Sequence, residues 1–593
     1  MRRLLSAALL AVFGWSAFAS APVAAQVQTA PTREEIQREA LDERLRRDPQ
    51  AISAIDSVER APCPLADPRF ADLMFTFQGV DFTGLDGIDP SIVENAYAEF
   101  LGRELNVAAI CDIRDRVATN LRRAQYLASV QVPVQQIEDG RIKLDVVIAR
   151  ISTAQVRGEA GPSGDALEGY IGRIAGQDLF NIDDVERYLL LARDIPGLDV
   201  RLTLQPVASG AQAGQVVGVF DVERTPVEAD LSIQNFGSKA IGRFGALGRV
   251  TFNGLTGMRD ATTVSFFLSE DPEEQQVLQL GHQFGVGSEG LRLGADVTFA
   301  WTNPDTPNVD PDPFESDSMV IAAYATYPFV RTQARNLFGT VGFDWIDQDV
   351  EFAGLPLSED RLRIAYGRLD FSALDEDSIV GVGGYSGVEP RWAVAGSLEV
   401  RQGLGIFGAS EACDANFANC LAPGVIPPAR LDGDPTGLVL RAAGRFEYRP
   451  TPELAFILSP RVQYSPDALF SYEQISGGNF TIGRGFDPGA AIGDSGYGAQ
   501  FEIAYGSLIP ETPDAIAWQP FVFFDLQAVS TKNVPGDPDT ISSIGGGVRT
   551  TIGQRATFDV FGAVPLERAP FDIERGDFRV LLSLTIKLAP WRR

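Results

Sequence analysis

The chain has 593 residues, of which 50 are Lys or Arg and 79 are Asp or Glu, so its formal net charge is −29. This acidic balance argues against nucleic acid as a partner, because phosphate binding needs clustered Lys and Arg. The single histidine, His282, nearly excludes histidine-based acid–base catalysis and a multi-histidine metal site. We therefore predict no catalytic residues, no metal and no cofactor.

Residues 1–25 have the pattern of a secretory signal peptide. Arg2 and Arg3 form the charged start, Leu4 to Phe18 the apolar core, and a small-residue cleavage site follows at Ala25. No later run of about 18 uninterrupted apolar residues is present. The mature chain is therefore either a soluble exported protein or a transmembrane β-barrel, since only helices and closed barrels satisfy their backbone groups in lipid.

Residues 26–64 form an N-terminal helix and a linker. The run PTREEIQREALDERLRRDP is helix-prone, with Thr32 as its N-cap and a thin apolar stripe. Such a polar helix is also typical of a frayed tail, and both interpretations remain open. The segment up to Pro64 lacks periodicity and is predicted to be a linker.

Residues 65–150 and 151–226 are predicted to be two α/β units with the same order: strand, helix, helix, strand, strand. In the first unit, alternation indicates a strand over Leu73 to Phe82, and Asp89-Pro90 precedes a helix. Two further strands flank the Asp139-Gly140 turn, and the first of them runs through Val134. The second unit has a helix that begins after Asn181.

Residues 227–593 change to repeated runs of about ten alternating residues, the pattern of an outer-membrane β-barrel. In the last run, Val580 and Leu582 fall on an apolar face, and Arg579 and Lys587 fall on a polar one. Sixteen strands are predicted, an even number as closure of an antiparallel bacterial barrel requires. They lie near 229–236, 243–254, 260–270, 275–285, 290–301, 318–330, 335–350, 359–373, 391–403, 436–449, 453–464, 496–507, 517–529, 541–551, 555–563 and 576–588.

Four cysteines in an exported chain suggest two disulfides. Cys413 and Cys420 bracket a short loop and pair most simply with each other, which leaves Cys63 and Cys111 as partners. Other connectivities remain open.

The most informative stretch is the glycine-rich connection 465–495. Its centre places Arg484 between Gly483 and Gly485, so the backbone can approach another surface while the guanidinium extends. A buried arginine needs a carboxylate, and the strand Gln519 to Ala528 carries Asp525 among aromatic residues. We predict that Arg484 pairs with Asp525.

These residues resemble a motif of outer-membrane transporters that carry polypeptide-transport-associated (POTRA) domains. In that family the sixth surface loop folds into the barrel with the motif V-R-G-F/Y, and its arginine pairs with an aspartate in an F-x-D-x-G strand. The matching residues are Arg484, Gly485 and Phe486 in the loop and Phe523 and Asp525 in the strand. Two positions depart from the motif, namely Gly483 before the arginine and Gln527 in place of the strand glycine.

The order of the α/β units resembles two POTRA domains, and YLASVQVPVQQIEDGRIKLDVV is similar to the first POTRA domain of two-partner secretion transporters. In that family paired cysteines flank the first POTRA helices, which matches Cys63 and Cys111. A comparable N-terminal helix can plug the barrel. The Gly493-Asp494-Ser495-Gly496 run imitates a serine-protease motif, but it matches a Gly-Asp pair that the family carries in its inward loop.

The resemblance implies a fold of α+β POTRA domains followed by an all-β, 16-stranded antiparallel transmembrane barrel in the outer membrane of a Gram-negative bacterium, with the POTRA domains in the periplasm. It implies transport of an unfolded client, a large β-helical exoprotein, to the cell surface. Other implied partners are outer-membrane lipid and, during biogenesis, the barrel-assembly machinery. The alternatives are a barrel insertase or assembly factor and a passive porin.

Overall fold

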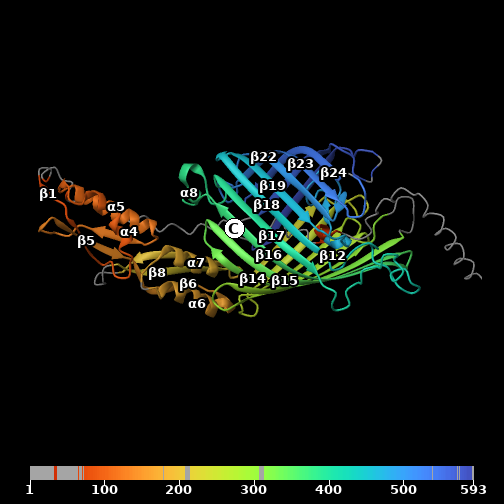
Figure 1. Cartoon of the computed structure of the whole chain (residues 1–593), viewed down its shortest axis with the longest axis horizontal. Coiled ribbons are helices and arrows are strands. Elements are labelled where there is room, and N and C mark those ends of the chain that lie inside the picture. The colour runs from red at the N-terminus through yellow and green to blue at the C-terminus, as the bar shows by residue number, and fades with distance from the viewer. Residues whose placement is uncertain are drawn as a thin grey trace, which may run out of the picture.

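The computed structural model describes residues 32–36, 65, 70, 73–177, 179–207, 214–305, 313–536, 538–553, 555–570, 572 and 574–590. The predicted signal peptide and most of the predicted N-terminal helix and linker lie outside these residues. Two α/β units are joined to one end of a β-barrel (Figure 1). Within the described part of the chain, no helix is long and apolar enough to cross a membrane.

The first α/β unit packs its helices on a sheet of order β2-β5-β4. Helix α5 buries Ile110, Ile113, Val117 and Leu121 completely, as their helical spacing predicts. Its elements are β1 (Met74–Thr76), β2 (Gly79–Thr83), α4 (Ser91–Glu94), η3 (Ala98–Phe100), β3 (Glu104–Asn106), α5 (Ala109–Arg123), β4 (Ala128–Gln131) and β5 (Arg141–Ile148).

Two predictions for this unit are wrong in detail. The strand expected to run through Val134 ends at Gln131, and Val134 is fully exposed, because Pro133 has no N–H to continue the ladder. The strand expected over Leu73 to Phe82 is two strands, of which β1 pairs with β3 and β2 pairs with β5.

The second α/β unit has a sheet of order β6-β8-β7. Asn181 caps α7 as predicted, and its side-chain oxygen accepts hydrogen bonds from the backbone N–H groups of Asp183 and Asp184. The elements are β6 (Arg150–Gly158), η4 (Gly161–Ser163), α6 (Gly164–Ala175), α7 (Ile182–Arg193), β7 (Leu198–Pro206) and β8 (Gln215–Arg224).

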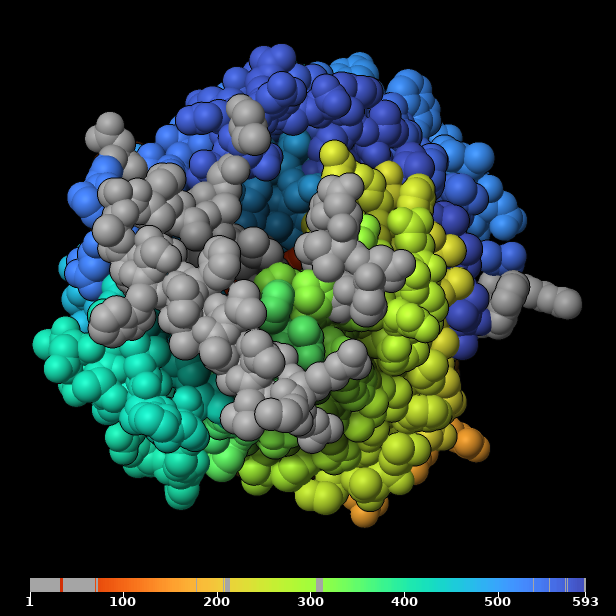
Figure 2. All heavy atoms as spheres, turned by 90° about the vertical axis from the view of Figure 1, so that its right-hand side faces the viewer, coloured from red at the N-terminus to blue at the C-terminus, as the bar shows by residue number. Residues whose placement is uncertain are grey.

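The remaining chain forms a closed antiparallel barrel of sixteen strands, as predicted, seen end-on in Figure 2. The last strand, β26, pairs with the first, β9. The strands are β9 (Val227–Gln234), β10 (Gly245–Asn253), β11 (Ala261–Ser269), β12 (Gln275–Val286), β13 (Leu291–Thr302), β14 (Phe314–Arg331), β15 (Arg335–Phe352), β16 (Leu355–Leu374), β17 (Trp392–Gly403), β18 (Leu438–Thr451), β19 (Leu454–Tyr464), β22 (Ser495–Tyr505), β23 (Ile516–Ser530), β24 (Asp539–Ile552), β25 (Ala556–Pro565) and β26 (Arg579–Ala589).

The barrel wall separates apolar from polar side chains by strand alternation. On β26, Val580 is 52% exposed on the outer face, whereas the side chain of the neighbouring Arg579 is 12% exposed on the inner one. Strands β14 to β16 are longer than the roughly 9–11 residues that cross a bilayer, and longer than we predicted, so the β15–β16 hairpin extends beyond the wall at the end away from the α/β units.

The second α/β unit is docked on the barrel turns at its own end. Arg331, which ends β14, donates two hydrogen bonds to Asp194 at the end of α7, at 2.9 and 2.7 Å. Arg259, between β10 and β11, donates to the Tyr170 hydroxyl of α6 at 2.7 Å. The β16–β17 connection at this end is long and contains α8 (Glu376–Ile379) and η5 (Val382–Gly384) (Figure 1).

Candidate functional site

The connection between β19 and β22, residues 465–494, folds back into the barrel, and we call it the inward loop. It forms a short hairpin of β20 (Ile475–Gly477) and β21 (Ala491–Gly493), preceded by η6 (Ser471–Glu473). Phe486 is 5% exposed and packs with Ile475 and Ala491 of the loop and with Val529 and Ile541 of the wall. This apolar cluster docks the loop on β23 and β24.

Arg484 and Asp525, predicted from sequence as a pair, are in contact. The Arg484 guanidinium donates from Nε to Asp525 Oδ2 at 3.0 Å and from Nη2 to Oδ1 at 2.8 Å, and the Arg484 backbone N–H donates to Oδ2 at 2.9 Å. Asp525 has no exposed surface and Arg484 is 8% exposed. The ion pair is therefore bidentate and buried, a geometry that arginine provides and lysine does not.

Two further groups complete the surroundings of Arg484. Its Nη1 donates to Glu502 Oε2 on β22 at 3.0 Å, and its Cζ lies 3.6 Å from the centroid of the Phe523 ring. Arg549 on β24 also donates to Glu502, so two arginines share this second carboxylate. The predicted residue Phe523 thus contacts the guanidinium through its ring face, a cation–π interaction.

The glycines on either side of Arg484 have different roles. Gly483 has φ +119°, which residues with a side chain rarely adopt. Gly485 allows close approach: an added Cβ would lie 2.9 Å from both Pro565 N and Ser543 Cβ on the wall. The Gly485 N–H donates to Ser543 Oγ at 3.2 Å.

Gln527, which stands where the family motif has glycine, is fully buried one lumen-facing position beyond Asp525. Its amide lies against the inward loop, because a Cβ on Gly477 would be 3.1 Å from the Gln527 Cδ and Oε1 atoms. Gly477 of the inward loop leaves room for the Gln527 side chain, so the Arg484–Asp525 contact forms although glutamine replaces the glycine of the motif.

Sequence reasoning missed a second ion cluster, at the start of the inward loop. Glu473 accepts hydrogen bonds from Arg401 on β17, at 2.9 and 3.0 Å, and from Arg441 on β18 at 3.1 Å. Arg401 also donates to Asp344 on β15 at 2.7 Å. Arg401, Arg441 and Asp344 lie on lumen-facing strand positions, where alternation predicts polar residues. The local sequence does not indicate which charged residue each of them pairs with.

Asp494, which we assigned to the inward loop, is fully buried at its end. Asp487, also in this loop, pairs with Arg579 of β26 at 2.8 Å and with Arg243, before β10, at 3.3 Å. The loop thus contacts both sides of the β26–β9 junction.

The described part of the N-terminal segment lies beside this loop. Thr32 caps α2 (Arg33–Ile36) as predicted: its Oγ1 accepts from the Glu35 N–H at 3.2 Å, and the Thr32 N–H donates to Glu35 Oε2 at 2.8 Å. Glu34 pairs with Arg461 of β19 and accepts from Ser476 Oγ of the loop at 3.0 Å. The red atoms inside the ring of strands in Figure 2 belong to this segment.

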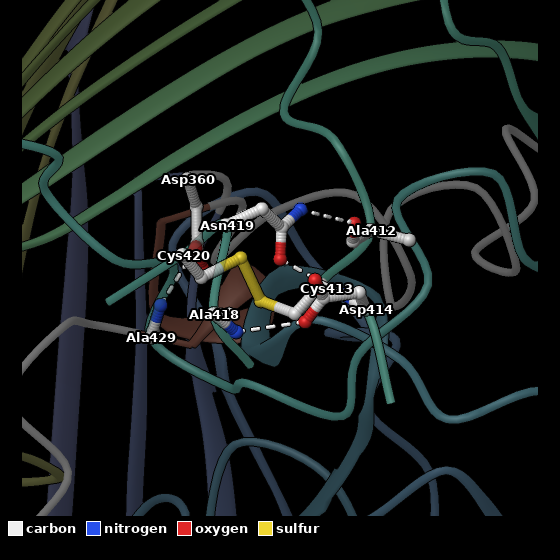
Figure 3. Close-up of a disulfide and its surroundings, with 8 residues drawn as sticks. All are labelled: Asp360, Ala412, Cys413, Asp414, Ala418, Asn419, Cys420 and Ala429. Carbon is white, nitrogen blue, oxygen red and sulfur yellow. Dashed lines mark hydrogen bonds between the residues drawn. A yellow bond between two sulfur atoms is a disulfide. The ribbon is translucent and has the colours of Figure 1, made fainter. Parts of the chain in front are cut away.

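Cys413 and Cys420 form a disulfide in the β17–β18 connection, as predicted (Figure 3). Asp414 accepts from the Ala418 N–H at 2.7 Å and Asn419 donates to the Ala412 carbonyl at 3.1 Å, and both hydrogen bonds stiffen the short loop that the disulfide closes. Cys111 is buried on α5, but Cys63 lies outside the described residues, so the second disulfide stays a prediction.

Two family models match the chain, one in its first α/β unit and one in its barrel. Residues 75–148, the first α/β unit, match the ShlB-type POTRA domain. Residues 384–550, which include the whole inward loop and its partner strand, match the haemolysin secretion/activation protein family ShlB/FhaC/HecB. In both matched regions the chain is thus similar to the two-partner secretion transporters.

The relatives of this transporter are distant in sequence. It is 20% identical over 247 residues to a heme/hemopexin transporter protein, HuxB, of Haemophilus influenzae strain 86-028NP. The matched region is 41% of this chain and 43% of the relative, so the chain matches less than half of the length of this curated protein.

Solved structures show the same fold over nearly the whole transporter. CdiB from Escherichia coli superposes with a TM-score of 0.70 at 16% identity, covering 93% of this chain and 97% of that one. CdiB from Acinetobacter baumannii gives a TM-score of 0.61 at 16% identity, covering 93% and 96%. The two family models together indicate an outer-membrane barrel with its POTRA region in the periplasm, so the end of the barrel away from the α/β units faces the cell exterior.

Proposed function

We propose that this protein captures an unfolded exoprotein in the periplasm through its POTRA domains and conducts it through the barrel to the cell surface. The observation that carries the proposal is the inward loop held inside a closed barrel by the buried Arg484–Asp525 pair. A passive porin has an open water-filled lumen, whereas this lumen holds the loop and the segment Thr32–Ile36.

The POTRA sheets provide the surface for capture. Strands β2 and β4 are the edges of the first sheet, and β6 and β7 are the edges of the second. An extended polypeptide can add to such an edge through main-chain hydrogen bonds, which do not depend on its sequence. The docking of the second unit on the barrel turns then directs a captured chain toward the periplasmic mouth.

We further propose that no reaction is catalysed, that the client is a large β-helical exoprotein and that Thr32–Ile36 belongs to a plug that leaves the lumen during transport. Outer-membrane lipid and, during biogenesis, the barrel-assembly machinery are the other partners. The domain boundaries that we propose are 26–64 for the N-terminal helix and linker, 65–150 and 151–226 for the POTRA domains, and 227–593 for the barrel.

The first test is quantitative proteomics of the culture medium and outer membrane of cells with the protein, without it, or with Arg484→Ala or Asp525→Ala. Arg484→Ala leaves the buried Asp525 without its arginine partner, a cost of about 3–5 kcal/mol, whereas Asp525→Ala removes the bidentate partner of Arg484 and leaves it only the Glu502 carboxylate. We expect one exoprotein, or very few, to disappear from the medium of the deletion strain and to decrease with both variants.

The other outcomes contradict the proposal in different ways. Depletion of many barrel proteins from the outer membrane would favour an insertase or assembly factor. No change in either fraction would favour a porin, and normal secretion by both variants would refute the role of the ion pair.

A further inference from the structure

The surface connection between β17 and β18, residues 404–437, is fixed to the β16 strand along its length, and we call it the strap loop. The Leu404 N–H donates to the Arg363 carbonyl at 2.8 Å, and the Ser410 N–H donates to the Arg361 carbonyl at 2.9 Å. Farther along, the Ala429 N–H donates to Asp360 Oδ1 at 2.9 Å (Figure 3). The strap loop is therefore an ordered cover on the exterior end of the barrel.

The last part of the strap loop rests on the beginning of the inward loop. The Asp434 N–H donates to the Ala468 carbonyl at 2.7 Å. A Cβ on Gly433 would lie 2.4 Å from the ring of Phe470, which is 1% exposed. Glycine at this position therefore allows the two loops to pack directly against each other.

Asp494 joins the two loops by charge. It accepts hydrogen bonds from the Leu469 N–H at 2.9 Å and the Gln474 side chain at 3.0 Å, both in the inward loop, and from the Lys532 N–H at 2.7 Å. Its ion-pair partner is Arg430 of the strap loop, with Nη1 2.6 Å from Oδ1. Arg430 also donates to the Leu469 carbonyl at 3.1 Å.

This anchor differs from those of Arg484 and Glu473. Arg484 pairs with carboxylates and Glu473 with arginines, and all of these partners are on strands that are fixed in the barrel wall. Asp494 pairs with a residue on a surface connection, which can move without breaking the barrel. If the inward loop left the lumen while the strap loop stayed, the ion pair would break, and Asp494 and Arg430 would each lose an oppositely charged partner.

We propose that the strap loop is a latch on the inward loop, that Arg430 and Asp494 are its positioning residues, and that the inward loop moves when this pair opens. The proposal rests on the transport function above and adds its regulation: the strap loop holds the inward loop in the lumen until the Arg430–Asp494 pair opens. A client that displaces the strap loop at the exterior end would open this pair and release the inward loop.

The test is single-channel recording of the full-length protein in planar bilayers, without any client. Arg430→Ala removes the latch charge and should raise the open probability roughly tenfold, a typical size for coupling between two sites. Arg430→Lys retains the charge and should restore much of the closed state. Asp432→Asn is the matched control, because Asp432 contacts Arg430 from within the strap loop and does not touch Asp494.

A double-mutant cycle makes the result specific to the pair. If Arg430 and Asp494 act together, Arg430→Ala combined with Asp494→Asn should open the channel no more than the more open single variant. Each variant is first checked for a folded barrel by its heat-modifiable migration on gels. An Arg430→Ala open probability equal to wild type, or additive effects in the cycle, would overturn the latch. Failure of the transport function would instead show as the absence of a client in the proteomic experiment.

Discussion

At the scale of single residues, the interior of this barrel is organised by arginine–carboxylate pairs rather than by isolated charges. Arg484 is held by a bidentate carboxylate, a second carboxylate and an aromatic ring, so its charge is compensated on three sides. Glu473 is held by Arg401 and Arg441 in the same manner. Such pairs fix one position of the loop, because each partner alone is costly to bury.

Asp360 is a residue for which the charge is not compensated in this way. It lies in the part of β16 that extends past its pairing with β17, at the exterior end, and accepts a hydrogen bond from the Ala429 N–H. Burial raises the pKa of Asp360 to about 6, with Arg361 lowering it and Asp349 raising it. Because the folded pKa is above the ordinary value of 3.8, ionisation of Asp360 destabilises the strap loop. This cost is full above pH 6, decreases as the pH falls below 6, and disappears only below the ordinary pKa.

We therefore predict that Asp360→Asn stabilises the strap loop by up to about 3 kcal/mol at pH 7 and by roughly half as much at pH 5. Hydrogen exchange of the peptide containing Ala429, compared between variant and wild type at each pH, measures this difference. Equal protection at pH 7, or a larger gain at pH 5 than at pH 7, would show that the Asp360 charge is not the cause.

At the scale of elements, the inward loop depends on shape as much as on charge. Its backbone lies close enough to β24 and β25 that Gly485 has no room for a side chain. The φ of Gly485 is not in the left-handed region, so the requirement for glycine there comes from the neighbouring strands and not from the backbone conformation.

Gly485→Ala should push the loop from the wall and cost about 1–3 kcal/mol, the usual penalty for overpacking. We expect weaker secretion of the client and a higher open probability in bilayers. Gly367→Ala on β16 is the matched control, because an added Cβ there meets nothing within 4 Å. If the two variants behave alike, close packing at Gly485 does not hold the loop.

At the scale of the whole molecule, the α/β units and the barrel form one path only if the second unit keeps its place at the periplasmic mouth. The Arg331–Asp194 pair and the Arg259–Tyr170 hydrogen bond fix α7 and α6 to barrel turns. The barrel itself closes through β26 and β9, whose ladder has a register shift between Lys587 and Ala589.

Asp194→Ala should loosen the second unit, because Arg331 then loses its bidentate partner. Spin labels at Glu168 on α6 and Val388 in the β16–β17 connection would report a broader distance distribution. Arg201→Ala is the control, since it breaks an ion pair with Asp199 inside the same unit. Identical distributions for Asp194→Ala and the control would mean that this pair does not fix the unit.

Features that repeat along the chain or follow a local rule could be predicted from the sequence. Alternation predicted sixteen strands and the two faces of β26, and spacing predicted the buried face of α5 and the Asn181 cap. It also indicated the Arg484–Asp525 pair, because a lone cation between glycines and a carboxylate among aromatics are each unusual in their surroundings. The tertiary structure alone decided the partners of Glu473 and Asp494 and the docking of α7, since these contacts join residues from distant elements and depend on how the chain closes. A polar residue facing the lumen has the same local pattern whether it faces water or a buried counter-charge, and only closure of the barrel around the inward loop distinguishes the two.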